Sequence, residues 1–342
     1  MDNKGLQKFM LIMLTWLELS CSSESIFSQL SKLQKINSAN NILDSSSPSG
    51  ISLVNDTLYI AAMHLFKKEN GNVERVNFSN SYEFVIDLVN LSGTTHLLTQ
   101  NKDGKLELYT LEDHVWKSKF IKDLSAIKFL KSITISGVQS AYILASKEDG
   151  NQIILDINGN DHTPSGINND DRFYQISNDS NLITGRSSKI WILGGSSISV
   201  NSKNEIMPII NTNIRGSRET LVFTGGGYDT SDNKFRIYSS TNNYQDSIFN
   251  RDDIGDFIAY FAREVNGTIL IGSNSGFVEL VKDKDTFILQ PPSQSVSPGS
   301  YNGSKLSKTR LNDIIPISND IIYILTQGKG LWKIENKNLT KE

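Results

Sequence analysis

The sequence is poor in cysteine, histidine and proline. Of its 342 residues, one is cysteine, four are histidine and seven are proline. A single cysteine excludes an internal disulfide, even in an exported protein, where disulfides are permitted. The histidines, at positions 64, 96, 114 and 162, include no pair at the HxH or HxxxH spacing typical of a zinc site. The sequence therefore predicts no metal site and no cofactor.

Net charge and long apolar runs are also small. The formal net charge is −3, and no stretch is basic enough to suggest nucleic-acid binding. The most apolar stretch, residues 9–17, is far shorter than the roughly 20 residues of a membrane-spanning helix. No GxSxG motif is present, and "TGGGYD" at 224–229 lies between strand-like runs, whereas a phosphate cradle precedes a helix. These absences argue against a nucleic-acid binder, a transmembrane helix and a serine hydrolase.

Residues 1–20 have the three parts of a secretory signal peptide. Two lysines come first, the apolar stretch follows, and the small residue Ser20 precedes Cys21. The arrangement resembles the lipobox of bacterial lipoproteins, whose cysteine is acylated after the preceding peptide is removed. The leucine usual three residues before the cysteine is replaced by Glu18, and Leu17 lies one position too early. The resemblance implies lipidation of Cys21 by fatty acids such as palmitate. The alternative is an ordinary or uncleaved signal peptide with an incidental cysteine.

The segment after Cys21 has the composition of a tether. Residues 22–50 are rich in Ser and Asn, and four apolar residues between 26 and 36 recur at the spacing of a short amphipathic helix. The stretch "DSSSPSG" at 44–50 is typical of a flexible linker. We therefore expect an acylated tether at 21–49 and a folded domain at 50–342. Two or more acyl chains anchor a protein stably, whereas one chain binds only marginally.

The remainder of the chain is dominated by hairpin patterns. In each, two runs rich in β-branched and aromatic residues flank a bend of Gly, Asn, Asp or Ser, the residues that reach positive φ. Seven instances lie at residues 56–76, 94–111, 140–157, 188–202, 219–239, 267–283 and 320–336. Additional strand-like runs lie between them, for example "EFVIDLVNL" at 83–91, "AIKFLKSITIS" at 126–136 and "FIAYFAREV" at 257–265.

The spacing of the hairpins predicts the fold. From Gly71 to Gly330 the six intervals average about 43 residues, and a period of about 40–50 with four short strands per unit is typical of a β-propeller. We therefore expect an all-β propeller of about seven four-stranded blades. Closure of the ring predicts that residues 50–62 lie beside the blade that contains 312–336. The alternative fold is a pair of β-sandwiches.

Few residues are candidates for chemistry. "DINGND" at 156–161 weakly resembles a calcium loop but lacks the closing glutamate, so an ordinary turn is favoured. Trp191 and Trp332 lie in hairpin arms with apolar neighbours, and we expect them to pack between blades. Trp116, in "DHVWKS", lies nearer a strand end and is a candidate anchor for a protein partner.

The loop at 290–310 is the second candidate for partner binding. It contains three prolines, no acidic residue, and the cations Lys305, Lys308 and Arg310. Proline lowers the entropic cost of ordering on binding. The loop, which we expect between the sixth and seventh blades, therefore presents either a basic contact strip or an idle insertion.

A lipid-anchored propeller of about seven blades resembles, in architecture, the propeller lipoprotein subunit of the outer-membrane β-barrel assembly machinery. That resemblance covers roughly residues 50–340. It implies a periplasmic position at the outer membrane and binding to envelope proteins, including the barrel-assembly complex. The blade motifs of that family are not matched. "GTILIGSNSGFVEL" and "QGKGLWKI" look more like the repeats of bacterial sensor propellers, so no binding residues are transferred.

The function that we expect from this reasoning is a non-enzymatic scaffold. An enzyme of the propeller class, a hydrolase or lyase, would carry several His, Asp, Glu, Arg or Tyr residues on the strands around the central channel. Four scattered histidines and many Ser and Asn residues favour protein binding instead. The alternatives that stay open are a propeller enzyme with a central-channel site and a surface adhesin.

Overall fold

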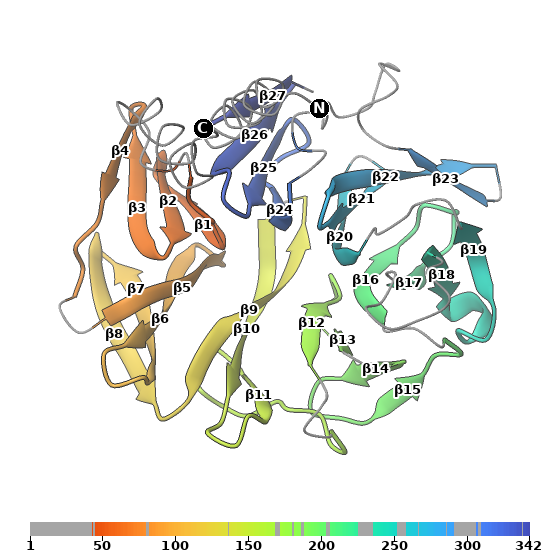
Figure 1. Ribbon diagram of the computed structural model, residues 1–342, viewed down its shortest axis with the longest axis horizontal. Coiled ribbons are helices and arrows are strands. Elements are labelled where there is room, and N and C mark those ends of the chain that lie inside the picture. Colours follow the sequence, from red (N-terminus) through yellow and green to blue (C-terminus); the bar gives the residue numbers. More distant parts are fainter. Residues whose placement is uncertain are drawn as a thin grey trace, which may run out of the picture.

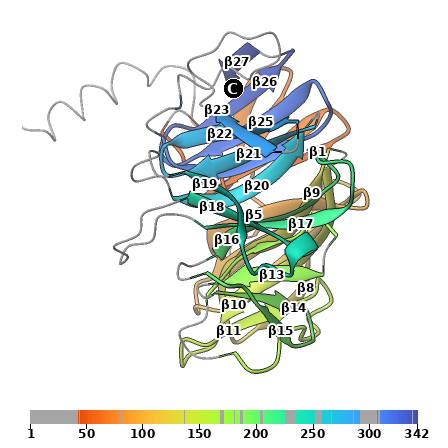
Figure 2. The ribbon, with the colours of Figure 1, turned by 90° about the vertical axis from the view of Figure 1, so that its right-hand side faces the viewer.

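The computed structural model describes a ring of seven small antiparallel β-sheets arranged around one axis (Figure 1). The described residues are 43 and 45–342, without 80–81, 136, 168–171, 180, 186–187, 203–205, 225–234, 252–257, 266, 285, 291–305, 307–308 and 337. Figure 2 views the same ring from its side. The prediction of a seven-bladed propeller is confirmed, and the alternative of two β-sandwiches is wrong. Cys21, Lys305 and Lys308 lie outside the described residues.

Each blade is formed by consecutive strands, the first of which is nearest the axis. Blade 1 contains β1 (Gly50–Val54), β2 (Thr57–Ala62), β3 (His64–Glu69) and β4 (Asn72–Arg75). Blade 2 contains β5 (Tyr82–Leu91), β6 (Thr94–Asn101), β7 (Leu106–Glu112) and β8 (Val115–Lys122). Blade 3 has three strands, β9 (Ser125–Thr134), β10 (Gly137–Ser146) and β11 (Gln152–Leu155). In the place of a fourth strand, blade 3 has a single bridge between Leu155 and Asp161.

The remaining four blades each have four strands. Blade 4 contains β12 (Phe173–Ile176), β13 (Leu182–Gly185), β14 (Lys189–Ile192) and β15 (Ser197–Ser199). Blade 5 contains β16 (Ile206–Thr212), β17 (Glu219–Thr224), β18 (Phe235–Ser239) and β19 (Ser247–Arg251), with a 3₁₀ turn η1 (Ser240–Asn242) after β18. Blade 6 contains β20 (Ala259–Val265), β21 (Thr268–Ser273), β22 (Gly276–Asp283) and β23 (Thr286–Gln290). Blade 7 contains β24 (Leu311–Pro316), β25 (Ile321–Thr326), β26 (Leu331–Glu335) and β27 (Asn338–Lys341).

The seven predicted hairpins all exist, but two occupy a different place in their blades. Five of them join the second and third strands; in blade 3 this pair is β10 and β11. In blade 1 the turn at Gly71 joins the third and fourth strands, and the hairpin at 188–202 is β14–β15, also the third and fourth. The three runs at 83–91, 126–136 and 257–265 contain inner strands β5, β9 and β20.

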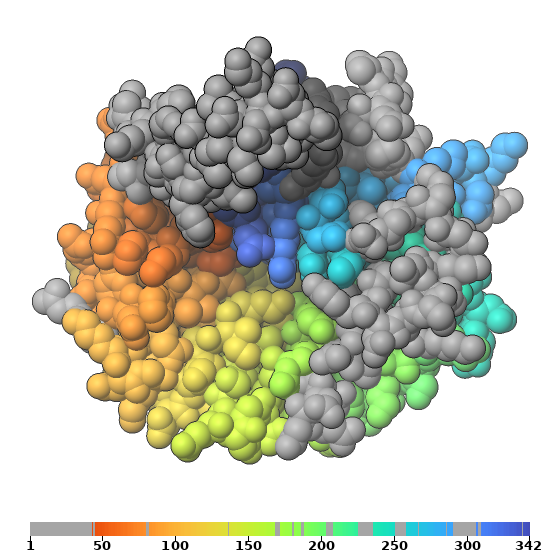
Figure 3. Space-filling model, viewed as in Figure 1, coloured from red at the N-terminus to blue at the C-terminus, as the bar shows by residue number. Residues whose placement is uncertain are grey.

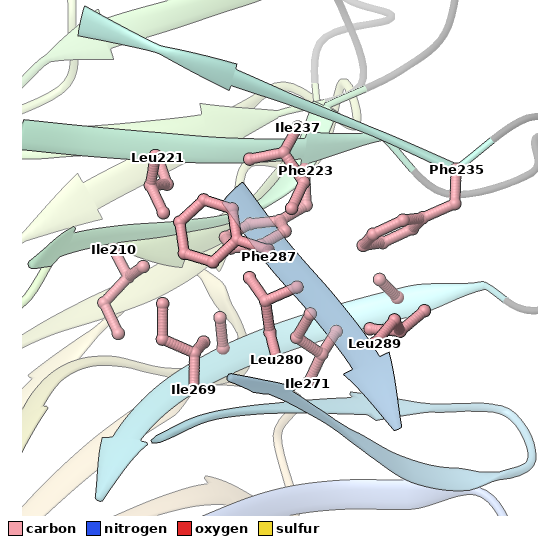
Figure 4. Packing of buried hydrophobic residues seen from close by; sticks show 12 residues of the cluster. Ile210, Leu221, Phe223, Phe235, Ile237, Ile269, Ile271, Leu280, Phe287 and Leu289 are labelled. Carbon is pink, nitrogen blue, oxygen red and sulfur yellow. The ribbon is translucent and has the colours of Figure 1, made fainter. Parts of the chain in front are cut away.

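Seven hydrophobic clusters, one for each blade-to-blade interface, form the core. The middle strands are buried on both faces, which is why they are nearly continuous apolar runs. Strand β2 illustrates the period of two: Leu58 and Ile60 pack toward blade 7, while Tyr59 and Ala61 pack toward blade 2. Figure 4 shows the largest cluster, where blades 5 and 6 meet around the buried side chain of Phe287.

The ring is closed by contacts between its first and last blades. Residues of β1 and β2 share a cluster with residues of β24, β25 and β26, as the sequence predicts. The Asn312 side chain donates to the Pro48 carbonyl at 2.8 Å, and the Gly330 amide donates to the Ser46 carbonyl at 3.0 Å. Leu43 is fully buried at this seam. Packing against blade 7 therefore begins on the N-terminal side of Gly50, within the stretch expected to be a flexible linker.

Blade 3 reaches across the axis. Near the tip of the β9–β10 hairpin, Ile133 joins the cluster between blades 7 and 1, and Ile135 packs against the cluster between blades 6 and 7. Figure 1 shows this hairpin extending to the centre of the ring. The hairpin tip therefore blocks the axis at the end where the inner strands finish. Within the described part of the chain, no helix has the length and apolar character needed to cross a membrane.

Candidate functional site: the central pocket

A pocket of about 370 Å³ lies on the ring axis. Six of the seven blades contribute to its wall, mainly through their inner strands, and no described residue of blade 5 does. Figure 3 views the ring down the axis, and the coloured surfaces of several blades converge at the middle of this face. Among the described residues, the polar side chains of the wall are Ser49, Asp87, Lys128, Lys131, Tyr174, Gln175, Tyr260, Arg263, Arg310, Asn312 and Asp313.

Strand alternation decides which blade each inner-strand residue contacts. On β9, Phe129 packs in the cluster with blade 2, while Leu130 packs in the cluster with blade 4. Lys131 points to the same face as Phe129 and contacts blade 2. Lys128 points to the same face as Leu130 and contacts blade 4. The polar residues of the inner strands therefore tie neighbouring blades together where those blades meet the axis.

Asp87 and Lys131 form the most buried ion pair of the pocket. The Lys131 ammonium is 2.6 Å from Asp87 Oδ1 and also donates to the Ser49 carbonyl at 3.2 Å, which ties blades 1, 2 and 3. The side chains are only 3% and 4% exposed. Asp87 also accepts from the amides of Leu88 and Phe129, at 2.7 and 2.9 Å. Both oxygens of its carboxylate are thus hydrogen-bonded, which is how a buried charge is made tolerable.

The carboxylate is also enclosed on the side of blade 1. A Cβ added at Gly50 would lie 2.3 Å from Asp87 Oδ1, so glycine is needed for the close approach of β1 to β5.

Arg263 and Asp313 form the equivalent pair between blades 6 and 7. Arg263 donates to Asp313 Oδ1 at 2.9 Å, and the same oxygen accepts from the Ile314 amide at 2.8 Å. A second guanidinium nitrogen of Arg263 donates to the Ala262 carbonyl at 2.9 Å. Its Nε is buried without a hydrogen-bond partner among the described residues.

Amides replace charges between blades 4, 5 and 6. The Gln175 side chain donates to the carbonyls of Ile209 (2.8 Å) and Ala262 (3.2 Å) and accepts from the Ala262 amide (3.0 Å). The Asn178 side chain likewise donates to the Asn211 carbonyl at 2.9 Å and accepts from the Asn211 amide at 2.7 Å. Neutral side chains thus satisfy main-chain groups that strand pairing leaves open at the axis.

Lys128 and Arg310 stand at the open end of the pocket, near the starts of their inner strands. Lys128 is partly buried and donates to the Tyr174 carbonyl at 2.6 Å. Burial lowers the pKa of Lys128 to about 8; Asp313 and Asp87 oppose this change, and Lys131 and Arg263 add to it. The exposed Arg310 guanidinium lies over the Tyr260 ring, 4.6 Å from its centre.

Of the residues predicted to bind a partner, Arg310 lies in this pocket and Trp116 does not. Trp116 is partly buried on the outermost strand of blade 2, with its ring edge-on to Tyr59 at 5.8 Å and 6.1 Å from Phe78. It lines a separate cleft of about 470 Å³ between blades 1 and 2. The structure therefore does not bring the two candidates together.

The other sequence expectations have simple outcomes. Trp191 packs between blades 3 and 4, edge-on to Phe173 at 6.3 Å, and Trp332 packs on the cluster of blades 6 and 7, as predicted. At 156–161 the loop is closed on itself, with Asp156 accepting from the amides of Asn158 and Asn160 at 2.8 and 2.9 Å. Burial acts to raise the pKa of Asp156, but these hydrogen bonds outweigh it and lower the pKa to about 2.

Most of the pocket was missed by sequence reasoning, although a signal exists. Asp87, Lys131 and Arg263 each interrupt an apolar run that the sequence marks as a strand. A charge inside a strand that is otherwise buried requires a partner. That observation identifies the residues, but it does not identify which residues pair.

The fold and the pocket define the class of protein, a seven-bladed β-propeller with a polar central pocket. No family model matches the chain. The chain is 58% identical over 345 residues to an uncharacterized protein of Borreliella burgdorferi, with 100% of this chain and 99% of that protein covered. The chain belongs to the family of that protein.

Solved propellers share the fold at low sequence identity. YCF48 bound to a D1 peptide has a TM-score of 0.53 and 10% identity, over 85% of this chain and 93% of that chain. YCF48 from Cyanidioschyzon merolae has the same score and identity, over 87% and 98%. The extracellular domain of the one-component system BT4673 from B. thetaiotaomicron has a TM-score of 0.56 and 12% identity, over 86% of this chain and 39% of that chain. These likenesses concern the fold alone.

Proposed function

We propose that the chain is a membrane-anchored lipoprotein that acts as a non-enzymatic protein-interaction scaffold in the bacterial cell envelope. The observation that carries the non-enzymatic part is the state of the two pocket carboxylates. Asp87 and Asp313 are each bonded to a cation and to at least one main-chain amide, so both serve to tie blades. A general acid or base needs a carboxylate that can reach a substrate proton. Among the described residues that line the pocket there is also no histidine.

The location part of the proposal rests on Cys21. Acylation there would attach the chain to the outer membrane, with the propeller on the periplasmic side. The ring then presents two faces and a blade edge to other envelope proteins. Arg310 at the central pocket and Trp116 in the cleft between blades 1 and 2 are the proposed contacts among the described residues. Lys305 and Lys308 belong to the same proposal.

The proposed partners are envelope proteins, with the outer-membrane barrel-assembly complex as the specific candidate. Two considerations support a protein partner. A propeller offers a rigid, closed frame whose loops can vary without loss of the fold. In addition, YCF48, whose fold is similar, has been solved bound to a peptide.

The experiment is an affinity purification of the tagged protein from its native membranes in mild detergent, with the intact mass of the mature N-terminus measured alongside. We expect a diacyl or triacyl Cys21 and a stoichiometric envelope partner. A Cys21→Ser variant is the control and is expected to leave the membrane fraction.

Two results would overturn the proposal. An unlipidated chain without a partner would refute the anchored scaffold and direct attention to an enzymatic ligand of the central pocket. A lipidated chain that is exposed to protease on intact cells would favour the adhesin alternative over a periplasmic position.

A further inference from the structure

The described residues of the central pocket carry an excess of positive charge. They include four cationic side chains and two carboxylates, so their formal charges sum to +2. Lys131 and Arg263 neutralise the carboxylates of Asp87 and Asp313. Within the described part of the chain, the other two cations, Lys128 and Arg310, make no salt bridge. Among the described residues, the charges that remain unbalanced are therefore the two at the open end.

Within the described part of the chain, Lys128 has unused hydrogen-bonding capacity. Its ammonium group has three donors, and one of them is used by the Tyr174 carbonyl. Burial, together with the nearby cations Lys131 and Arg263, makes the charged form costly, which lowers the pKa to about 8, although Asp313 and Asp87 oppose the change. The ammonium is still mainly charged at pH 7. An anion in the pocket would lower this cost and would therefore be bound favourably.

Arg310 is held in a position suited to a carboxylate. Its guanidinium lies over the face of Tyr260 at 4.6 Å, and its carbonyl accepts from the Gln327 amide at 2.8 Å, which fixes the backbone. The ring contact leaves the N–H edges of the guanidinium available, since no described residue accepts from them. Such an edge binds a carboxylate through two parallel hydrogen bonds.

Arg263 also has one donor that no described residue satisfies. The residue is 5% exposed and lines the wall, and its Nε is buried without a hydrogen-bond partner among the described residues. Buried polar groups without a partner are uncommon in folded proteins.

The shape of the pocket limits the kind of ligand. The hairpin tip at Ile133 and Ile135 blocks the axis beyond the pocket, so a polypeptide cannot pass through the ring. The volume of about 370 Å³ exceeds the needs of a single inorganic anion and is in the range for a small ligand. Phe129, Leu130, Phe261 and Leu311 add apolar surface to the wall. The pocket is thus closed at one end, partly apolar, and lined by cations at its opening. Such a pocket is suited to the terminal residues of a polypeptide.

From these features we infer that the central pocket binds the C-terminal carboxylate of a partner polypeptide, with Lys128 and Arg310 as the two cationic contacts. The inference rests on the proposed scaffold function, because it supplies the chemistry by which that scaffold would recognise a partner. Capture of a terminal carboxylate is an established mode of peptide recognition. A free small carboxylate shares this chemistry, and the experiment separates the two sources.

The test uses the reactivity of Lys128 toward an amine-acetylating reagent, read by peptide mass spectrometry on the full chain. The probes are an equimolar pool of random pentapeptides with free C-terminal carboxylates, the same pool amidated at the C-terminus, and citrate. At a free-acid concentration of about twice its Kd, acetylation of Lys128 is expected to slow about threefold. The amidated pool should have little effect, and acetylation of the exposed Lys102 should not change.

Matched variants identify the contacts. Arg310→Gln is expected to abolish the protection of Lys128 by the free-acid pool. Arg218→Gln, on an exposed arginine near Asp179 in blade 4 and outside the pocket, should leave protection intact. Equal protection by the free-acid and amidated pools, or protection by citrate alone, would refute capture of a chain terminus. Absence of protection by every probe would refute the anion site.

Failure of this inference can be told apart from failure of the scaffold proposal. The same variants, Lys128→Met and Arg310→Gln, enter the native-membrane purification. A partner that both variants retain refutes the pocket as its binding site and leaves the scaffold intact. Recovery of no partner by the unaltered protein, together with protection of Lys128 by the free-acid pool, refutes the scaffold and leaves the carboxylate site.

Discussion

The two sides of the ring are tied at the axis by different chemistry. Around blades 1, 2 and 3, and between blades 6 and 7, the ties are the buried ion pairs Asp87–Lys131 and Arg263–Asp313. Across blades 4, 5 and 6 they are the amides Gln175 and Asn178, bonded to main-chain groups. Both kinds of tie satisfy buried polar groups. Only the ion pairs place full charges beside the pocket.

The two kinds of tie contribute differently to stability and to the charge of the pocket. An amide tie has no net charge and acts only over hydrogen-bond distance. An ion pair needs both partners, because removal of one leaves an uncompensated buried charge, whereas removal of both is often neutral. The unbalanced cations Lys128 and Arg310 belong to blades 3 and 7, which are on the charged side. Among the described residues of the pocket, the excess positive charge therefore lies on the side of the ring that is tied by ion pairs.

The largest expected effect comes from breaking an ion pair on the charged side. Lys131→Met leaves Asp87 buried and uncompensated, and we expect a loss of about 3–5 kcal/mol in the free energy of unfolding. Denaturant unfolding followed by tryptophan fluorescence measures it. The double variant Asp87→Asn with Lys131→Met should recover most of the loss. If the double variant is as unstable as the single one, the loss comes from packing, and the comparison of the two sides fails.

Breaking an amide tie should cost less. Gln175→Leu leaves the carbonyls of Ile209 and Ala262 and the amide of Ala262 without their partner. We expect a loss of about 2–3 kcal/mol in the free energy of unfolding. No second substitution is expected to recover it in the way that Asp87→Asn recovers the loss from Lys131→Met. The same unfolding assay applies, with the exposed Gln245→Leu as the control. A loss that matches Lys131→Met would mean that charge adds nothing to the cost of breaking a tie.

The sequence predicted the ring far better than it predicted the pocket. The hairpins are visible because a strand buried on both faces is an apolar run and its turns need glycine or asparagine, as at Gly71 and Gly150, whose φ values are +80° and +83°. The place of a hairpin in its blade was less certain. The run at 188–202 has the same composition as its counterparts, yet it forms the third and fourth strands.

The pocket depends on pairs that are distant in the sequence. Asp87 and Lys131 are 44 positions apart, and Gln175 and Ala262 are 87 apart. No local pattern announces such a pair, because a lone charge in an apolar strand shows only that a partner is needed. Arg310 was found because its loop is conspicuous in composition. Lys128 was not found, because a lysine near the start of a strand resembles any solvent-exposed lysine.

The packing at the seam between the first and last blades can be tested by comparing two turn glycines, Gly330 and Gly71. Gly330 has a φ of +77°, and a Cβ there would lie 2.4 Å from the Leu43 carbonyl oxygen. Gly71 has a φ of +80° and no atom within 4 Å of that position. Gly71→Ala should therefore cost only the strain of a left-handed residue, about 1–2 kcal/mol, and Gly330→Ala about 2 kcal/mol more. If Gly71→Ala and Gly330→Ala destabilised the protein equally in thermal unfolding, the backbone around Leu43 would have moved to admit the new methyl group without a loss of stability.

The smallest expected effect is the pH dependence that Lys128 gives to the charged side. The pKa of Lys128 falls from 10.5 to about 8 on folding, so between these values the unfolded chain binds more protons than the folded one. Stability should therefore rise with pH from about 8 toward 10.5, relative to a Lys128→Met variant that lacks the group. By pH 9 the relative gain over pH 7 should be about 1.3 kcal/mol.

Unfolding free energies of both proteins at pH 7 and 9 measure this difference, since the other titrating groups are common to both. A Lys102→Met variant, altered at an exposed lysine in a turn of blade 2, should show no relative change. If the difference in unfolding free energy between the unaltered protein and Lys128→Met were the same at pH 7 and 9, the Lys128 ammonium would be as well solvated in the folded chain as in the unfolded chain. An anion near Lys128 would then bring no electrostatic gain. The blades tied by ion pairs would differ from the blades tied by amides in geometry alone.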